Sequence, residues 1–159
     1  MLKINILCIG KIKEDYLKEA INEYKKRLSR YCKINIIELS DEKIPDKIND
    51  TIIENIKNIE AEKMSQYLKK ETYSICLDLK GREITSEEFA KKIQEISNTS
   101  SSITFIIGGT LGIGDKVKTS SKEKICFSKM TFPHQLIRLF LLEQIYRAFK
   151  IINNEVYHR

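Results

Sequence analysis

The sequence lacks the residues that a metal site needs. It has only two histidines, and its four cysteines lie far apart with no C-x-x-C pair. Three of these cysteines fall in apolar, strand-like runs, where a free thiol behaves as a small buried side chain. We therefore expect no metal site, and in a cytoplasmic protein no disulfide framework. The cysteines are Cys8, Cys32, Cys76 and Cys126.

Long hydrophobic runs are also missing. No segment approaches the roughly 20 apolar residues that a membrane-spanning helix needs. The opening MLKINILCIG is followed by a charge-rich amphipathic stretch and by no small-residue cleavage site, so it indicates a first strand and not a signal peptide. No internal repeat, low-complexity segment or linker divides the 159 residues. We expect one domain, residues 1–159, that is cytoplasmic and has no membrane partner.

The charge distribution is uneven. The net charge is +6, and residues 115–159 hold nine Lys/Arg against four Asp/Glu, whereas residues 1–114 hold 19 against 18. A basic end on a nearly neutral body suggests a polyanionic partner that meets one face. A solvated basic surface that keeps the protein soluble explains the same numbers equally well, so this asymmetry alone does not decide.

Strand-like and helix-like segments alternate along the chain. This alternation predicts an α/β domain with a mostly parallel sheet flanked by helices. Thr85 opens the third helix, with Glu88 completing a capping box, and Lys80-Gly81 predicts a turn that ends the third strand. The predicted strands are 3–9, 33–39, 73–79, 103–107 and 124–128, and the predicted helices are 14–30, 51–70, the segment that Thr85 opens, 115–120 and 133–149.

Three segments at strand ends form the candidate ligand site, because open α/β sheets bind ligands at the carboxyl ends of their strands. The glycine-rich turn 108–114 (GGTLGIG) follows the fourth strand, and the loop 127–132, unusually apolar for a surface connection, follows the fifth. Residues 77–79 complete the floor. The turn does not match G-x-G-x-x-G, and by itself it would be read as a tight turn without a ligand.

The last helix (PHQLIRLFLLEQIYRAF) is apolar on almost every side. In a small domain such a helix usually packs against a partner subunit. Arg138 stands on its apolar side. A buried ion pair and an arginine presented to an anionic substrate explain this position equally well.

Four motifs resemble one known family along nearly the whole chain. They are FIIGGTLG, FSKMTFPHQLIR, EQ-x-YRAF and the terminal YHR, at 105–112, 127–138, 143–149 and 157–159. They resemble the RlmH family, the pseudouridine N3-methyltransferases of large-subunit ribosomal RNA in the SPOUT superfamily. The resemblance implies a SPOUT-like domain with a C-terminal trefoil knot, in which residues 103–159 form the cofactor-binding knot region.

The resemblance also implies a homodimer that binds S-adenosylmethionine (SAM) in the knot, near the subunit interface. It implies an enzyme whose substrate is ribosomal RNA within the assembled ribosome. The cofactor contacts that it implies are Leu77, Gly108, Phe127, Ser128, Lys129, Met130, Thr131 and Phe132.

The same resemblance gives the terminal residues a role in binding RNA. Tyr157 and His158 carry rings that stack on bases, and Arg159, like Arg138, is suited to hold phosphate. Methylation at N3 requires loss of a proton, which a base or a cation beside the acceptor would assist. We expect Arg138 and His158 to serve catalysis, and His134 is the only other histidine.

Three other functions are compatible with the residues. A SPOUT-like methyltransferase could act on another RNA such as transfer RNA. A basic RNA-binding module would have no catalytic activity and no affinity for SAM. A flavodoxin-like nucleotide- or flavin-binding protein is disfavoured, because the glycine motif comes after the fourth strand and not the first.

Overall fold

The computed structural model describes residues 1–68 and 71–158. Five strands alternate with five helices, as the sequence pattern predicts. The strands are β1 (Lys3–Ile9), β2 (Lys33–Leu39), β3 (Tyr73–Glu83), β4 (Ser102–Ile107) and β5 (Glu123–Cys126). The helices are α1 (Asp15–Leu28), α2 (Asp50–Ser65), α3 (Ser86–Ser97), α4 (Asp115–Ser120) and α5 (His134–Ile152).

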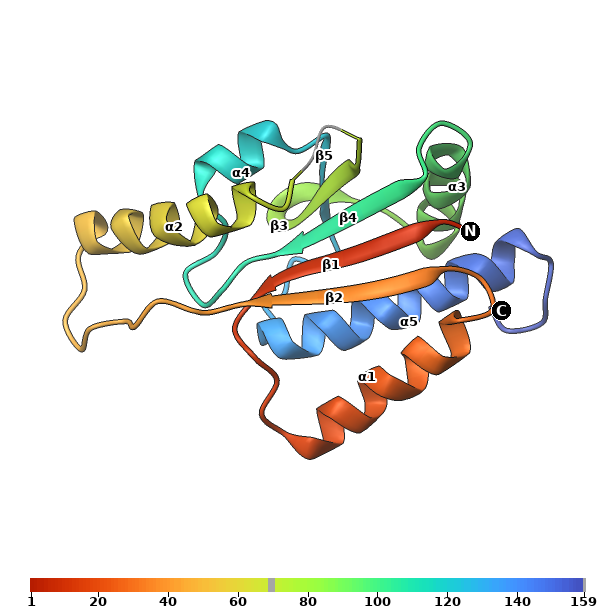
Figure 1. Cartoon of the computed structure of the whole chain (residues 1–159), viewed down its shortest axis with the longest axis horizontal. Coiled ribbons are helices and arrows are strands. Elements are labelled where there is room, and N and C mark those ends of the chain that lie inside the picture. The colour runs from red at the N-terminus through yellow and green to blue at the C-terminus, as the bar shows by residue number, and fades with distance from the viewer. Residues whose placement is uncertain (69–70, 159) are drawn as a thin grey trace.

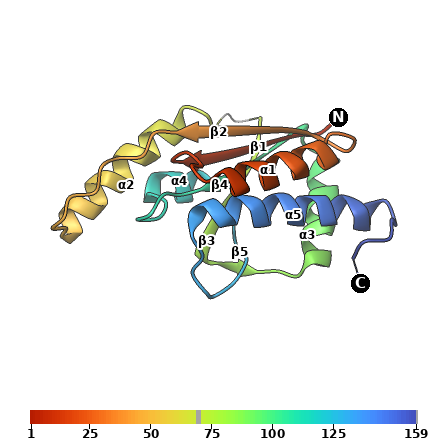
Figure 2. The same cartoon turned by 90° about the horizontal axis from the view of Figure 1, so that it is seen from below.

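The strands form one sheet in the order β2-β1-β4-β3-β5, and every neighbouring pair is parallel. All carboxyl ends therefore lie at one edge of the sheet, and the arrowheads of β1, β2 and β4 point to it, towards the left in Figure 1. Alternate residues of each strand point to opposite faces. One face packs against α1, α3 and α5 in the larger core, and the other packs against α2 and α4 in a smaller one (Figures 1 and 2). This confirms the predicted α/β domain.

β3 differs from its prediction. The turn predicted at Lys80-Gly81 does not end the strand, which continues to Glu83 with an irregularity between Leu77 and Arg82. Ile125 of β5 pairs with both of these residues. A Cβ on Gly81 would lie 2.6 Å from the Ile125 backbone, so glycine is required by a close strand approach and not by a reversal of direction.

The other boundaries move by a few residues, as element ends usually do. α2 ends at Ser65, so the end predicted at Lys70 falls outside the described residues. α5 runs three residues beyond its predicted end, to Ile152. The predicted capping box is present: the Thr85 hydroxyl accepts from the Glu88 N–H at 3.1 Å, and the Glu88 carboxylate accepts from the Thr85 N–H at 2.8 Å.

α5 lies on the sheet between α1 and α3 (Figure 2). Its fully buried apolar residues are Leu141, Leu142, Ile145 and Ala148. The sheet, α1 and α3 therefore cover much of the apolar surface of α5 that we expected a partner subunit to cover. Phe140 is still 38% exposed, and Phe132 stacks against it edge to face at 5.5 Å. No helix in the described ranges is long and apolar enough to span a membrane.

Candidate active site

A cavity of about 650 Å³ opens at the carboxyl ends of the strands. This volume is within the range of small-molecule sites. Its walls come from the end of β3, the glycine turn after β4, the loop after β5 and the first turn of α5. The lining residues are Lys57, 77–80, 107–113, Lys118, 125–128, 130–134 and Ile137.

The glycine turn brings its own backbone close together. A Cβ on Gly108 would lie 2.7 Å from the Ile113 side chain and 2.8 Å from the Gly112 carbonyl carbon. Gly112 has φ +93°, a conformation that L side chains rarely adopt, and its N–H donates to the Gly109 carbonyl at 3.0 Å. The glycines therefore leave main chain close to the cavity, beside Thr110, Leu111 and Ile113.

Glu60 of α2 supports this turn from behind. Its carboxylate is 5% exposed and accepts from the Glu42 N–H at 3.1 Å. A Cβ on Gly109 would lie 3.2 Å from Glu60 Oε1. Burial raises the pKa of the Glu60 carboxyl. Nothing in the sequence singled this residue out, because a glutamate on a helix is ordinarily solvated.

The loop after β5 forms the opposite wall. Phe127 packs against Phe89 of α3 in the larger core, and Ser128 Oγ accepts from the Met130 N–H at 3.0 Å. Met130 is 72% exposed in the single chain. Its thioether is left available to a ligand or a second subunit.

Seven of the eight residues predicted to bind the cofactor line this one cavity: Leu77, Gly108, Phe127, Ser128, Met130, Thr131 and Phe132. Lys129 is the exception. Its side chain is 88% exposed and lies 3.8 Å from the Glu83 carboxylate. The structure brings together three segments, 77–79, 108–114 and 127–132, that are 13 or more positions apart in the sequence.

The cavity also contains charged groups and a histidine. Asp78 and Lys118 form an ion pair at 3.2 Å whose side chains are only 13% and 21% exposed. His134 lies at the start of α5, and burial and the nearby Arg138 lower the pKa of its imidazole. His134 is therefore neutral at physiological pH. The sequence pointed to it only as one of two histidines and did not assign it to the site.

Arg138 forms a buried ion pair, one of the two roles between which the sequence did not decide. The side chain is 1% exposed and donates to Glu38 Oε2 at 2.8 Å. It also donates to the carbonyls of Ile9 and Gly10 at 3.0 and 2.7 Å. The guanidinium thus ties α5 to the ends of β1 and β2, one turn away from the cavity. Its contact with RNA stays a prediction, which this geometry does not favour.

The carboxyl-terminal tail packs against the middle of α5. The Tyr157 hydroxyl donates to Glu143 Oε1 at 3.1 Å, and the Tyr157 ring lies 4.8 Å from the Arg147 guanidinium. His158 lies between Arg147 and Glu87, at 3.1 and 2.7 Å. Arg159 lies outside the described residues. Arg147 follows His134 by 13 positions, about 20 Å along a helix, so His158 is remote from the cavity of its own chain.

Metal binding finds no support among residues 1–68 and 71–158, which contain no cluster of three or more His, Cys, Asp or Glu side chains.

The fold and the sequence match known proteins. Residues 2–158 match the family described as "Predicted SPOUT methyltransferase". A probable methylase family protein from Haemophilus influenzae has a similar structure, with a TM-score of 0.55 over 98% of this chain and 70% of that one, at 11% identity. That likeness concerns the fold. The chain is a SPOUT methyltransferase.

Its relatives define the family more narrowly. Ribosomal RNA large subunit methyltransferase H 1 of Clostridium perfringens is 52% identical over 99% of this chain and 100% of its own length. Ribosomal RNA large subunit methyltransferase H of Clostridium acetobutylicum is 50% identical over the same shares. The chain belongs to this methyltransferase H family.

Proposed function

We propose that this protein transfers the methyl group of SAM to N3 of a pseudouridine in large-subunit ribosomal RNA. The observation that carries this proposal is the identity of about half of all residues, over full length, to enzymes named for methylation of that RNA. The cavity supports it, because seven of the eight residues that the family resemblance assigns to the cofactor line it.

The residues of the cavity fit SAM. The apolar walls, among them Leu77, Phe127 and Ile137, suit an adenine ring, and the main chain of the glycine turn offers hydrogen bonds at close range. Asp78 adds a carboxylate to a site that receives a cationic ligand. When bound, SAM supplies an activated methyl group on a sulfonium. The protein's part is to align the acceptor nitrogen with that methyl and to exclude water.

His134 is our candidate for the group that accepts the N3 proton. It lines the cavity, and its lowered pKa keeps a nitrogen lone pair free at neutral pH. Lys57 lines the same cavity and supplies positive charge that stabilises the pseudouridine anion formed when N3 loses its proton. Arg138 then acts as a positioning residue, because its three hydrogen bonds hold the first turns of α5 against the sheet.

A homodimer would complete the site. Phe140, Met130 and the neighbouring Phe132 form an apolar patch that the chain does not cover, next to the cavity mouth. The tail residues Tyr157 and His158 are too far from their own cavity to reach a nucleotide bound there. If they contact RNA as the family resemblance implies, they do so at the cavity of the second subunit. The trefoil knot of residues 103–159 and a cytoplasmic location stay predictions.

Methyl transfer from labelled SAM to ribosomes that lack the modification tests this function, with the modified nucleotide mapped afterwards. Label at N3 of a pseudouridine in large-subunit RNA supports the proposal. Label in transfer RNA alone would show that the substrate is transfer RNA, with methyl transfer from SAM still the reaction. Absence of SAM binding in calorimetry would favour a non-catalytic RNA-binding module.

Gly108→Val links the activity to the cavity. The branched side chain would enter the space held by Ile113 and Gly112, so SAM affinity should fall by at least about tenfold. Thr51→Val is the control, because it introduces the same side chain at an exposed position of α2 that lies outside the cavity lining. Both variants must first show wild-type circular dichroism. Unchanged SAM affinity in a folded Gly108→Val would contradict the placement.

A further inference from the structure

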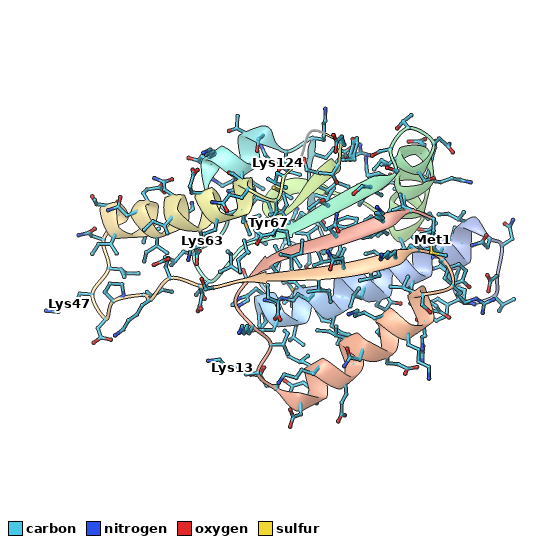
Figure 3. The ribbon with its side chains drawn as sticks, in the orientation of Figure 1. Met1, Lys13, Lys47, Lys63, Tyr67 and Lys124 are labelled. Carbon is cyan, nitrogen blue, oxygen red and sulfur yellow. The ribbon has the colours of Figure 1, made fainter. Side chains whose placement is uncertain are left out.

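One half of a sheet face has no helix over it. α2 and α4 cover the carboxyl half of the face opposite α5, where Leu7, Ile9 and Cys76 belong to the smaller core. Towards the amino ends of β1 and β2 no helix lies in front of the strands (Figure 1). In Figure 3 the labelled side chains of Lys63, on α2, and Tyr67, just after it, stand to the left, whereas Met1 marks the amino ends to the right.

The side chains on this half-face form two polar rows across the sheet. The strand register aligns Lys33, Lys3 and Ser102 in the outer row, and Asn35, Asn5, Thr104 and Ser74 in the inner one. The next row inward, Ile37, Leu7, Ile106 and Cys76, is apolar and lies under the helices. The side chains of the sheet thus change from apolar to polar where α2 and α4 stop covering it.

A hydrogen-bonded layer links these side chains. The Asn35 amide donates to Asn5 at 3.4 Å, and the Asn5 amide donates to the hydroxyls of Ser102 and Thr104 at 3.3 and 3.4 Å. Those two hydroxyls also bond Thr72 at 3.1 and 2.8 Å. The network fixes the polar groups in place while the outer lysines and Asn35 stay exposed.

Two lysines of the outer row repel each other, and a bound anion would relieve this repulsion. Lys3 and Lys33 are direct neighbours on adjacent strands, a like-charge pairing that destabilises a sheet. Neither forms an ion pair within the described part of the chain, and the two polar rows contain no acidic residue.

A second cavity, of about 490 Å³, continues the polar surface beyond β3. It combines hydroxyls with the ammonium of Lys122, the donors that a phosphate requires, whereas its other lysine, Lys116, is ion-paired with Glu62. Its lining residues are Ser65, Leu68, Thr72, Ser74, Lys116, Ser120 and Lys122. The Lys122 main chain is fixed by hydrogen bonds from its N–H to the Ser74 carbonyl and hydroxyl, at 3.0 and 3.2 Å.

We propose that this half-face, with Lys3, Lys33 and Lys122 as its cations, binds the phosphodiester backbone of the RNA substrate. The inference rests on the proposed function for the identity of the RNA. Flat polar rows with fixed amides and hydroxyls suit phosphate and ribose contacts that position an RNA without reading its sequence. The surface lies at the opposite end of the strands from the active-site cavity, so it would hold RNA flanking the target nucleotide.

The test compares two double variants that each remove two positive charges. Lys3→Gln with Lys33→Gln changes the half-face. Lys26→Gln with Lys91→Gln is the control, because these exposed lysines lie on α1 and α3, which cover the other face of the sheet. Affinity for purified large-subunit ribosomal RNA is measured between about 0.05 and 0.2 M salt. SAM affinity, thermal stability and the kcat and KM for ribosomes are measured alongside.

We expect the half-face variant to bind RNA roughly tenfold more weakly and to reduce the salt slope by nearly two units, because two phosphate contacts are lost. KM for ribosomes should rise while kcat and SAM affinity stay unchanged. Thermal stability should stay equal or increase as the like-charge pair disappears. The control should match the wild type.

Two results would overturn the inference. One is a half-face variant whose RNA affinity and salt slope equal those of the control. The other is normal binding to purified RNA with weaker binding to ribosomes only, which would assign the surface to an acidic ribosomal protein. Failure of the wild type to methylate ribosomes would instead refute the proposed function, and a salt-dependent RNA affinity that needs Lys3 and Lys33 would still stand.

Discussion

Replacing Arg138 by methionine tests whether this residue serves the fold or the substrate. Methionine keeps a long apolar stem but removes the hydrogen bonds to Glu38, Ile9 and Gly10. Removing one partner of a buried ion pair costs about 3–5 kcal/mol. The Glu38 side chain is 34% exposed, so its carboxylate regains water. We therefore expect the lower end, about 3 kcal/mol, and a fall in melting temperature of about 6–12 °C.

Urea unfolding at one fixed protein concentration measures this loss, and a double-mutant cycle assigns it. Glu38→Gln keeps an acceptor but removes the charge, which should cost about 1–2 kcal/mol. The double variant should lose less than the sum of the two, with a coupling of at least about 1 kcal/mol. An Arg138→Met protein within about 0.5 kcal/mol of wild type would refute the structural role. An RNA-binding salt slope lower by about one unit would then support the contact with RNA.

The remaining predictions concern three other parts of the molecule. Gly81→Ala should destabilise the protein by about 1–3 kcal/mol in urea unfolding, because its Cβ meets the Ile125 backbone, and an unchanged midpoint would contradict the close strand approach. The lowered pKa of His134 means that the unfolded chain binds its proton first, so this histidine's contribution to stability is present above about pH 6.5 and is lost as the pH falls further. His134→Gln should therefore reduce the slope of unfolding free energy against pH below about pH 6.5. A variant with the same slope as the wild type would show that His134 does not cause this pH dependence. Deleting residues 157–159 should abolish methyl transfer to ribosomes while SAM affinity changes little, and a normal rate would leave the tail without a role in RNA binding. That deletion also removes the Tyr157 phenol, whose pKa burial raises to about 12, so one fewer tyrosine should titrate above pH 10 by absorbance.

Local patterns in the sequence predict most of the fold. Short apolar runs predict the strands, amphipathic stretches predict the helices between them, and a long apolar stretch predicts the last helix, because period and length distinguish helix from strand. The Thr85 capping box is likewise local, since both of its bonds lie within four residues. The candidate site follows from one further rule. Parallel strands bring their carboxyl ends to one edge, so the segments after them must meet. The individual contacts came from the family resemblance, and seven of those eight residues line one cavity.

Contacts between distant segments depend on the tertiary structure alone. Arg138 pairs with Glu38, which lies 100 residues earlier in the chain. The pattern of α5 could therefore suggest a buried ion pair but could not identify the partner of Arg138. His134 lines the candidate site because α5 begins at the cavity wall, and Gly81 is needed because β5 passes within van der Waals distance of β3. Lys3 and Lys33 are neighbours only because the strand order places β2 beside β1. Packing over the whole chain sets the strand order and register. The order and register in turn place lysines, amides and hydroxyls from distant parts of the sequence side by side on one surface.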